Sequence, residues 1–373
     1  MKSANLVNKL ARPRHLATSG DGWREEKNEA NESLRRLRRS FKASCGKFFR
    51  RDCRRNFRRA GKIKNMKLNQ VAISTIWNID VRNNIKDALI QIKKLGFSSI
   101  EVAYNLREIR LEELIAATID LGIQVVSVHN FCPVPVQENW GRFFTDYYRL
   151  SSPNKSERQQ AIDATKMTID IANSIGAKAV VIHAGTIEMD NKYIKGLFQL
   201  YKQGKRATSE YEFQLEQFNA NRFSSKDTYM DAVVKSFEEI VPHAAGCNIK
   251  LGMENRYYPN EIPDINEAEY LLDIFGKKGL VYWHDTGHAD VQGKLGIEMP
   301  ETYLSRFKDF KDYLYGCHIH DVKGVDDHLP PFTGEIDFVK MKPYLESCTV
   351  KVIEAHQPAT PEQIKSAVDK LCS

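Results

Sequence analysis

Histidines and carboxylates recur in this chain at the points where apolar, β-branched runs stop. Eight of the nine histidines that follow Met66 occupy such points, most of them beside a carboxylate. The segments are VVSVHN (His129), VVIHAG (His183), LGMENR (Glu254), VYWHDTGH (His284, Asp285, His288), YGCHIHD (His318, His320), VDDHLPP (Asp326, His328) and VKVIEAH (Glu354, His356). Strands that end at one place can deliver all these side chains to a common point, so the pattern predicts a metal site.

Four of these residues form the strongest candidate ligand set, because each ends one of four successive apolar runs: Glu254, Asp285, His318 and Glu354. An unpaired charge after such a run is costly to bury, and a divalent cation would compensate all three carboxylates. Three carboxylates and one imidazole suit Mn²⁺, Mg²⁺ or Zn²⁺.

Five further side chains could face the same cavity: His129, His183, His288, Asp326 and His328. Nine ligands are too many for one ion, so the sequence predicts one to three ions per chain, with carboxylates bridging them. Three other histidines are as consistent with a structural or supporting role as with metal binding, namely His284, His320 and His356.

The elements that must position these residues alternate regularly along the chain. Strand-like runs cover 71–75, 99–104, 124–129, 178–183, 249–254, 279–285, 314–320 and 350–354. Helical patterns lie between them, for example over 83–96, 156–176, 264–279 and 360–372, with Ser156 and Thr360 as expected N-caps. Eight strands in this alternation predict a (β/α)₈ TIM barrel over residues 66–373, with its active site at the C-terminal strand ends. The segment 185–225 is expected to be an insertion or lid over that face.

A doubly wound open sheet is the alternative fold. It would not bring ligands from strands three to eight to one point, and no GxGxxG motif follows the first strand.

Charge divides the chain into a basic arm and an acidic body. Residues 1–65 contain 20 Lys and Arg against 6 Asp and Glu, a net charge of +14, whereas the remainder carries −7. Apolar residues at roughly helical spacing could make the arm an amphipathic helix for nucleic acid, a membrane or organelle import. The favoured interpretation is a disordered tail, or sequence upstream of a start at Met66, because Met66 leads directly into the first predicted strand. The acidic body disfavours a nucleic-acid partner for the barrel.

The cysteines and the apolar stretches bear on the cellular compartment of the protein. Seven cysteines without a CxxC pair fit a reducing environment, in which thiols serve as small apolar fillers. No apolar stretch approaches the ~18 residues of a membrane span, and the N-terminus lacks the apolar core of a secretory signal. We therefore expect a cytoplasmic protein.

Five segments carry a resemblance to a known family: GMENR, HDTGHA, HIHD, DDHLPP and GEIDF. Together they resemble the xylose-isomerase-like TIM-barrel superfamily over about residues 68–372, and within it the sugar phosphate isomerase/epimerase group. The superfamily contains sugar isomerases, sugar 3-epimerases and the endonuclease IV family of DNA repair enzymes.

The epimerase-type branch implies one metal ion held by the four strongest candidates. The ion would polarise a sugar carbonyl and stabilise a cis-enediolate, while Glu254 and Glu354 move the proton on and off carbon. His288 and Arg256 would orient substrate hydroxyls. Glu101 and Lys323 are two further candidates for substrate binding.

The endonuclease IV branch implies three zinc ions, nine ligands and phosphodiesterase activity on abasic DNA. All nine ligands have a counterpart among the residues above, which favours the nuclease. The resemblance to the sugar-enzyme group also allows the additional histidines, however, so the ligand count does not decide between the branches. A protein that grips DNA normally shows a basic footprint, and the acidic body lacks one.

We therefore expect a metal-dependent sugar isomerase or epimerase that takes a small, non-phosphorylated sugar and forms a homo-oligomer. A non-catalytic barrel that binds a sugar or polyol is the third hypothesis.

Overall fold

The computed structural model describes residues 66–67, 70–79, 84–134, 147–298, 303, 305 and 311–373. The predicted basic arm, residues 1–65, lies outside the described residues.

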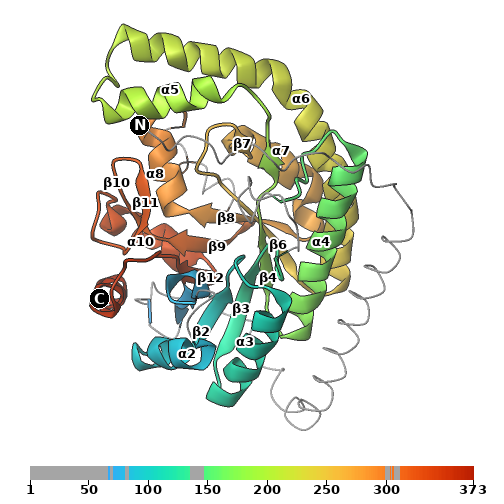
Figure 1. The fold of residues 1–373 in the computed structure, drawn as a ribbon, viewed down its shortest axis with the longest axis vertical. Coiled ribbons are helices and arrows are strands. Elements are labelled where there is room, and N and C mark those ends of the chain that lie inside the picture. Colours follow the sequence, from blue (N-terminus) through green and yellow to red (C-terminus); the bar gives the residue numbers. More distant parts are fainter. Residues whose placement is uncertain are drawn as a thin grey trace, which may run out of the picture. The chain divides into compact units, whose positions relative to one another are not determined.

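Eight parallel strands close into a barrel at the centre of the structure (Figure 1). In spatial order they are β1 (Ala72–Ser74), β12 (Val350–Ile353), β9 (Leu314–Ile319), β8 (Leu280–Asp285), β6 (Lys250–Glu254), β4 (Ala179–Ile182), β3 (Gln124–His129) and β2 (Ser99–Val102). Nearly every residue in these strands is buried, which explains their continuous apolar runs. The predicted (β/α)₈ barrel is confirmed.

A helix follows each barrel strand along the chain. These helices are α2 (Ile85–Lys94), α3 (Glu108–Leu121), α4 (Lys155–Ser174), α6 (Ser209–Gly246), α7 (Ile265–Phe275), α8 (Thr286–Lys294), α10 (Phe338–Ser347) and α11 (Pro361–Cys372). Short 3₁₀ turns follow β1 and α7, at Thr75–Trp77 and Gly276–Lys278. Thr360 caps α11 as predicted. The predicted cap of α4 is wrong by two residues, because Asn154 accepts the backbone N–H groups that need a partner.

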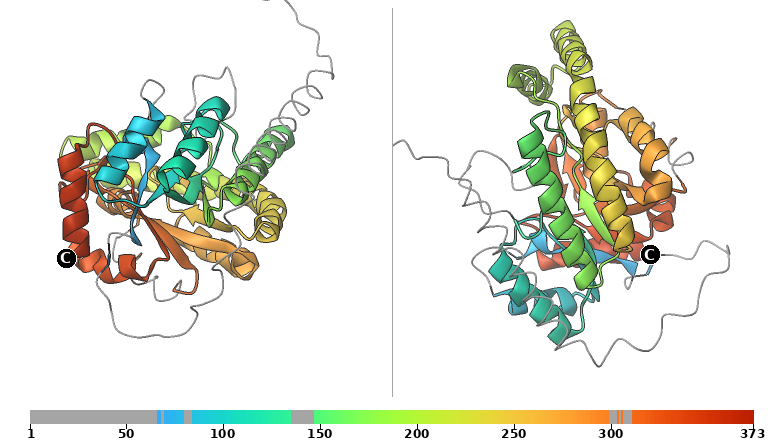
Figure 2. Two further views of the ribbon diagram at one scale, coloured as in Figure 1. Left: turned by 90° about the horizontal axis from the view of Figure 1, so that it is seen from below. Right: turned by 90° about the vertical axis from the view of Figure 1, so that its right-hand side faces the viewer.

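The predicted insertion over 185–225 is a helical hairpin. It comprises β5 (Gly185–Thr186), α5 (Asn191–Lys202) and the first part of α6, and α5 packs on α6 through an apolar cluster that includes Leu197, Tyr211 and Phe218. Figure 2 shows this pair of helices extending past the barrel. Phe198 of α5 lies 5.5 Å from Tyr257, ring centre to ring centre, in the segment after β6. The hairpin therefore flanks the C-terminal strand ends, and its movement as a lid stays a prediction.

Two small antiparallel sheets are built on the segments that leave the barrel strands. β5 pairs with β7 (Glu261–Ile262), and β10 (Asp321–Lys323) pairs with β11 (Asp326–Leu329). The second sheet follows β9 directly, so it holds the DDHLPP segment beside the end of the barrel.

One large aromatic side chain, Trp283 of β8, packs inside the barrel. Trp283 is fully buried among small and branched residues that include Ala179, Val181 and Val352. A Cβ atom at Gly252 of β6 would lie 2.8 Å from the indole, and one at Gly316 of β9 would lie 2.2 Å from it. Both neighbouring strands therefore need glycine where the indole crosses them, and Trp283 forms the floor beneath the predicted site.

No helix among the described residues is both long enough and apolar enough to cross a membrane.

Candidate metal centre

Four side chains meet at the C-terminal end of the barrel, and we call them the central cluster: Glu254 of β6, Asp285 of β8, His318 of β9 and Glu354 just after β12. All four are buried, and their ligand atoms lie within 4.8 Å of one another. Nδ1 of His318 lies 2.8 Å from the Glu354 carboxylate and 3.8 Å from that of Asp285, and it also contacts Glu254. The structure thus brings together the four residues that the sequence ranks first.

The other imidazole nitrogen of His318 points into the barrel. Nε2 lies 3.0 Å from the Glu101 carboxylate, which also accepts a 2.7 Å hydrogen bond from the Ser127 hydroxyl. Glu101 is fully buried and engaged with His318, and its predicted role in binding substrate stays a prediction. In this position it fixes the orientation of His318, as carboxylates do behind metal-bound histidines.

The donor set of the central cluster fits a divalent cation. With Nε2–H donated to Glu101, the lone pair of His318 Nδ1 faces carboxylates, which are also acceptors. The acceptors that face one another here need either a second proton on Nδ1 or a cation bound among them. Burial opposes the charged form of His318, but Glu354, Glu101 and Glu254 outweigh it and hold its pKa well above the ordinary value. A cation bound to the four ligands would take the place of that proton.

The carboxylates of the cluster are held ionised. Burial alone would raise the pKa of Glu254, but His318, His183 and Arg256 outweigh it and bring that pKa well below the ordinary value. Burial also opposes the ionised form of Glu354, where His318 again prevails and lowers the pKa. Both carboxylates can therefore act as ligands or proton acceptors at neutral pH.

Arg256 is committed to protein carboxylates. Its guanidinium contacts Glu254 and lies 3.1 Å from Glu261, and the side chain is buried. Its predicted role in orienting substrate hydroxyls stays a prediction, since the guanidinium here contacts Glu254 of the central cluster.

A second group of potential ligands adjoins the central cluster and shares Glu254 with it. It contains His129, the last residue of β3, and His183, which directly follows β4. His183 Nε2 lies 3.2 Å from Glu254, and its Nδ1 has no hydrogen-bond partner among the described residues. Burial lowers the pKa of His183 well below the ordinary value, so its imidazole is neutral and able to bind a metal.

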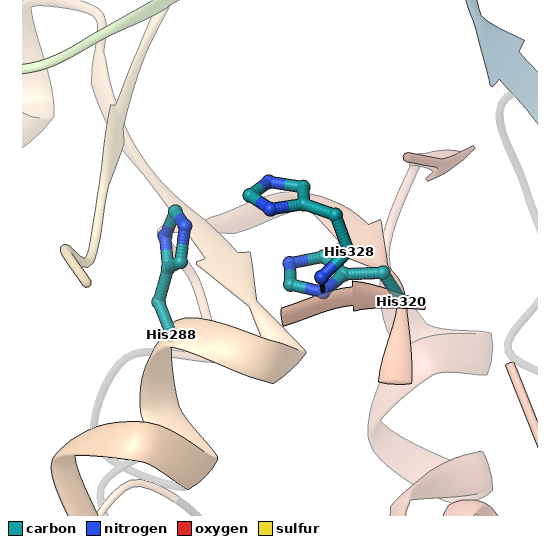
Figure 3. Close-up of side chains that lie close together, drawn as sticks. All are labelled: His288, His320 and His328. Atoms are coloured by element: carbon teal, nitrogen blue, oxygen red, sulfur yellow. Dashed lines mark hydrogen bonds between the residues drawn. The ribbon is translucent and has the colours of Figure 1, made fainter. Parts of the chain in front are cut away.

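A third group, which we call the outer histidine group, consists of His288, His320 and His328. Figure 3 shows His288, on α8, opposite the other two rings. The rings of His320 and His328 are stacked with centres 4.2 Å apart, and His288 lies 5.6 Å from each. His356 extends the stack, 3.8 Å from His328.

His320 connects the outer histidine group to the central cluster. Its Nε2 lies 2.8 Å from Asp285, and its Nδ1 accepts the backbone N–H of His328 at 2.9 Å. With both nitrogens engaged, His320 supports Asp285 much as Glu101 supports His318. The sequence holds a signal for it, because His318 and His320 are two residues apart and strand side chains alternate with that period.

The structure does not bring Asp326 to the site. Its exposed carboxylate lies 3.5 Å from Lys202, and the neighbouring Asp327 faces the outer histidine group, 3.0 Å from His328 and 3.8 Å from His288. Adjacent residues of a strand point to opposite faces, so only one of the two could face inward. In this structure Asp327, rather than the predicted Asp326, faces the outer histidine group. Lys323, at the end of β10, is exposed, and its predicted role in binding substrate stays a prediction.

Comparison with known proteins agrees with the architecture. A family model described as xylose isomerase-like TIM barrel matches residues 89–371. The uncharacterized protein y4fM of Sinorhizobium fredii is 21% identical over 307 residues, which are 77% of this chain and 82% of the relative.

Solved structures of sugar epimerases share the fold. The 3-keto-D-glucoside 4-epimerase YcjR of E. coli superposes with a TM-score of 0.57 at 16% identity, covering 81% of this chain and 98% of that one. D-psicose 3-epimerase of Clostridium cellulolyticum H10, crystallised with D-tagatose, gives 0.55 at 16% identity with the same coverage. Because the family model covers most of the barrel, the chain belongs to the xylose isomerase-like TIM-barrel family.

Proposed function

We propose that this chain is a divalent-metal-dependent sugar isomerase or epimerase that moves a proton through an enediolate. The observation that carries the proposal is the central cluster, in which three buried carboxylates surround Nδ1 of one imidazole within 4.8 Å. The sugar epimerases among the structural neighbours support a sugar as the substrate class. The net charge of −7 from Met66 onward weighs against a polyanionic substrate.

The roles of the residues follow from their contacts. Glu254, Asp285, His318 and Glu354 would hold the ion, which when bound would polarise the substrate carbonyl and acidify the neighbouring C–H. Glu254 and Glu354 are ionised at neutral pH, so one of them would take the proton from carbon. The other would deliver a proton to the opposite face of that carbon in an epimerisation, or to the adjacent carbon in an isomerisation. Arg256 and His183 keep Glu254 in place, and Trp283 closes the barrel beneath the reacting atoms.

Deuterium exchange tests the proposal directly. The full-length protein, loaded with Mn²⁺, is incubated in D₂O with a panel of ketoses that includes D-tagatose and D-psicose. We expect loss of the proton NMR signal at a carbon next to the carbonyl for at least one sugar. The Glu354→Gln variant should lower the exchange rate about 10²–10⁴-fold.

The matched control is Asp326→Asn, since Asp326 is exposed and pairs with Lys202. This variant should exchange at the wild-type rate. If the metal-loaded wild-type protein incorporated no deuterium into any ketose, the proposal would be wrong.

An endonuclease IV-like phosphodiesterase that acts on abasic DNA is the second candidate function. It is favoured by potential ligands beside the central cluster that could hold second and third ions, namely His129 and His183 on one side and His288 and His328 on the other. Metal analysis of the purified protein separates the candidates. One Mn²⁺ or Mg²⁺ per chain supports the isomerase, whereas three zinc ions together with cleavage of an abasic-site duplex support the nuclease.

A further inference from the structure

A separate set of metal-type donors lies on the outside of the barrel, between α4 and α6. Asp170 comes from α4, and His243 and Cys247 come from the end of α6. His243 Nε2 lies 2.9 Å from the Asp170 carboxylate, and Cys247 Sγ lies 3.7 Å from the same oxygen. The three ligand atoms are within 4.8 Å of one another.

The local structure explains why these donors converge. His243 and Cys247 are four residues apart, so they lie on one face of α6, one turn from each other. α4 and α6 lie side by side (Figure 1), and one turn earlier the same interface is bridged by Lys166 and Glu239 at 2.7 Å. The interface therefore continues from an ordinary ion pair into a cluster that contains a thiol.

The electrostatic setting favours a cation. α4 ends at Ser174 and α6 at Gly246, so the cluster lies near the C-terminal ends of two helices, which carry partial negative charge. β4 and β6 begin a few residues later, so this end is the N-terminal face of the barrel, opposite the central cluster. The side chains of His243 and Asp170 are 32% and 25% exposed, which leaves them accessible to an ion from solvent.

We propose that Asp170, His243 and Cys247 bind a zinc ion. One nitrogen, one oxygen and one sulfur donor suit Zn²⁺ in tetrahedral geometry, with water as the fourth ligand. The ion would link α4 to α6 on the face opposite the central cluster. This site is independent of the proposed sugar chemistry, so either proposal can fail without the other.

Cobalt spectroscopy on the full-length protein tests the site, because a thiolate bound to Co²⁺ gives an intense near-ultraviolet charge-transfer band. The central cluster and its two neighbouring groups offer only nitrogen and oxygen donors, so they cannot produce this band. We expect the band on titration with Co²⁺ and its loss on addition of Zn²⁺. Cys247→Ala should abolish the band, and His243→Gln should weaken it.

Two control variants should keep the band. Cys372→Ala removes another partly exposed thiol, and Glu239→Gln breaks the neighbouring ion pair without removing a proposed ligand. Circular dichroism of each variant verifies folding. An absent band in the wild-type protein, or a band that survives in folded Cys247→Ala, would overturn the proposal.

Discussion

The central cluster and the outer histidine group are neighbours, joined by the hydrogen bond between His320 and Asp285, but they are built differently. The central cluster comes from the ends of barrel strands and is rich in carboxylates. The outer histidine group comes from the start of α8 and from the segment around β10 and β11, and it is rich in imidazole. The closed barrel fixes where the strand ends lie. The positions of the outer histidines instead depend on the conformation of the segments that follow β8 and β9. We therefore expect the first metal ion at the central cluster.

The largest expected effect comes from matched substitutions, one in each region. Asp285→Asn should weaken metal binding more than about 100-fold, because it removes a direct ligand rather than a supporting group. Asp327→Asn makes the same chemical change beside the outer histidine group and should leave the first ion bound. Isothermal titration with Mn²⁺ measures both variants. Equal losses would show that the two regions form one site.

A smaller effect on metal affinity should follow from weakening the hydrogen bond that orients His318, with all proposed ligands kept in place. Glu101→Gln retains the shape of the side chain but replaces the charged acceptor of His318 Nε2. We expect metal affinity to fall about 10–100-fold, in the range typical of groups that support a ligand. Ser127→Ala, which removes only the hydroxyl that contacts Glu101, is the milder companion. Unchanged affinity in Glu101→Gln would refute the positioning role.

The smallest effect concerns the pH dependence of stability in the metal-free protein. Burial lowers the pKa of His356 to about 3, against about 6.5 when unfolded. Between these values the unfolded chain binds a proton that the folded chain does not, so stability should fall as pH falls through this window. His356→Phe keeps a ring beside His328 and should reduce that slope by up to about 1.4 kcal/mol per pH unit.

Urea unfolding at a series of pH values, with a chelator present, checks this prediction. A slope in His356→Phe identical to that of the wild-type protein would contradict it.

The barrel and the central cluster could be predicted because they depend on short-range signals. Apolar runs that end in Glu254 or Asp285 mark both a strand and the place where it stops. The role of Glu101 could not be predicted, since its partner His318 comes from a distant strand of the barrel. The role of Arg256 could not be predicted either, because it depends on how the segment after β6 turns to bring Glu254 and Glu261 to one guanidinium. The choice between Asp326 and Asp327 turns on strand register, and a shift of one residue exchanges the two faces.

The indole of Trp283 restricts which substitutions the barrel can accept during evolution. It occupies space that Gly252 and Gly316 leave open on the two adjacent strands, so no one of the three positions can vary alone. A side chain at either glycine would need a smaller residue at 283, and a smaller residue there would leave a void beneath His318, whose ring lies 5.4 Å from the indole. The three positions should therefore covary among homologues, and a natural sequence with alanine at 252 or 316 should lack tryptophan at 283.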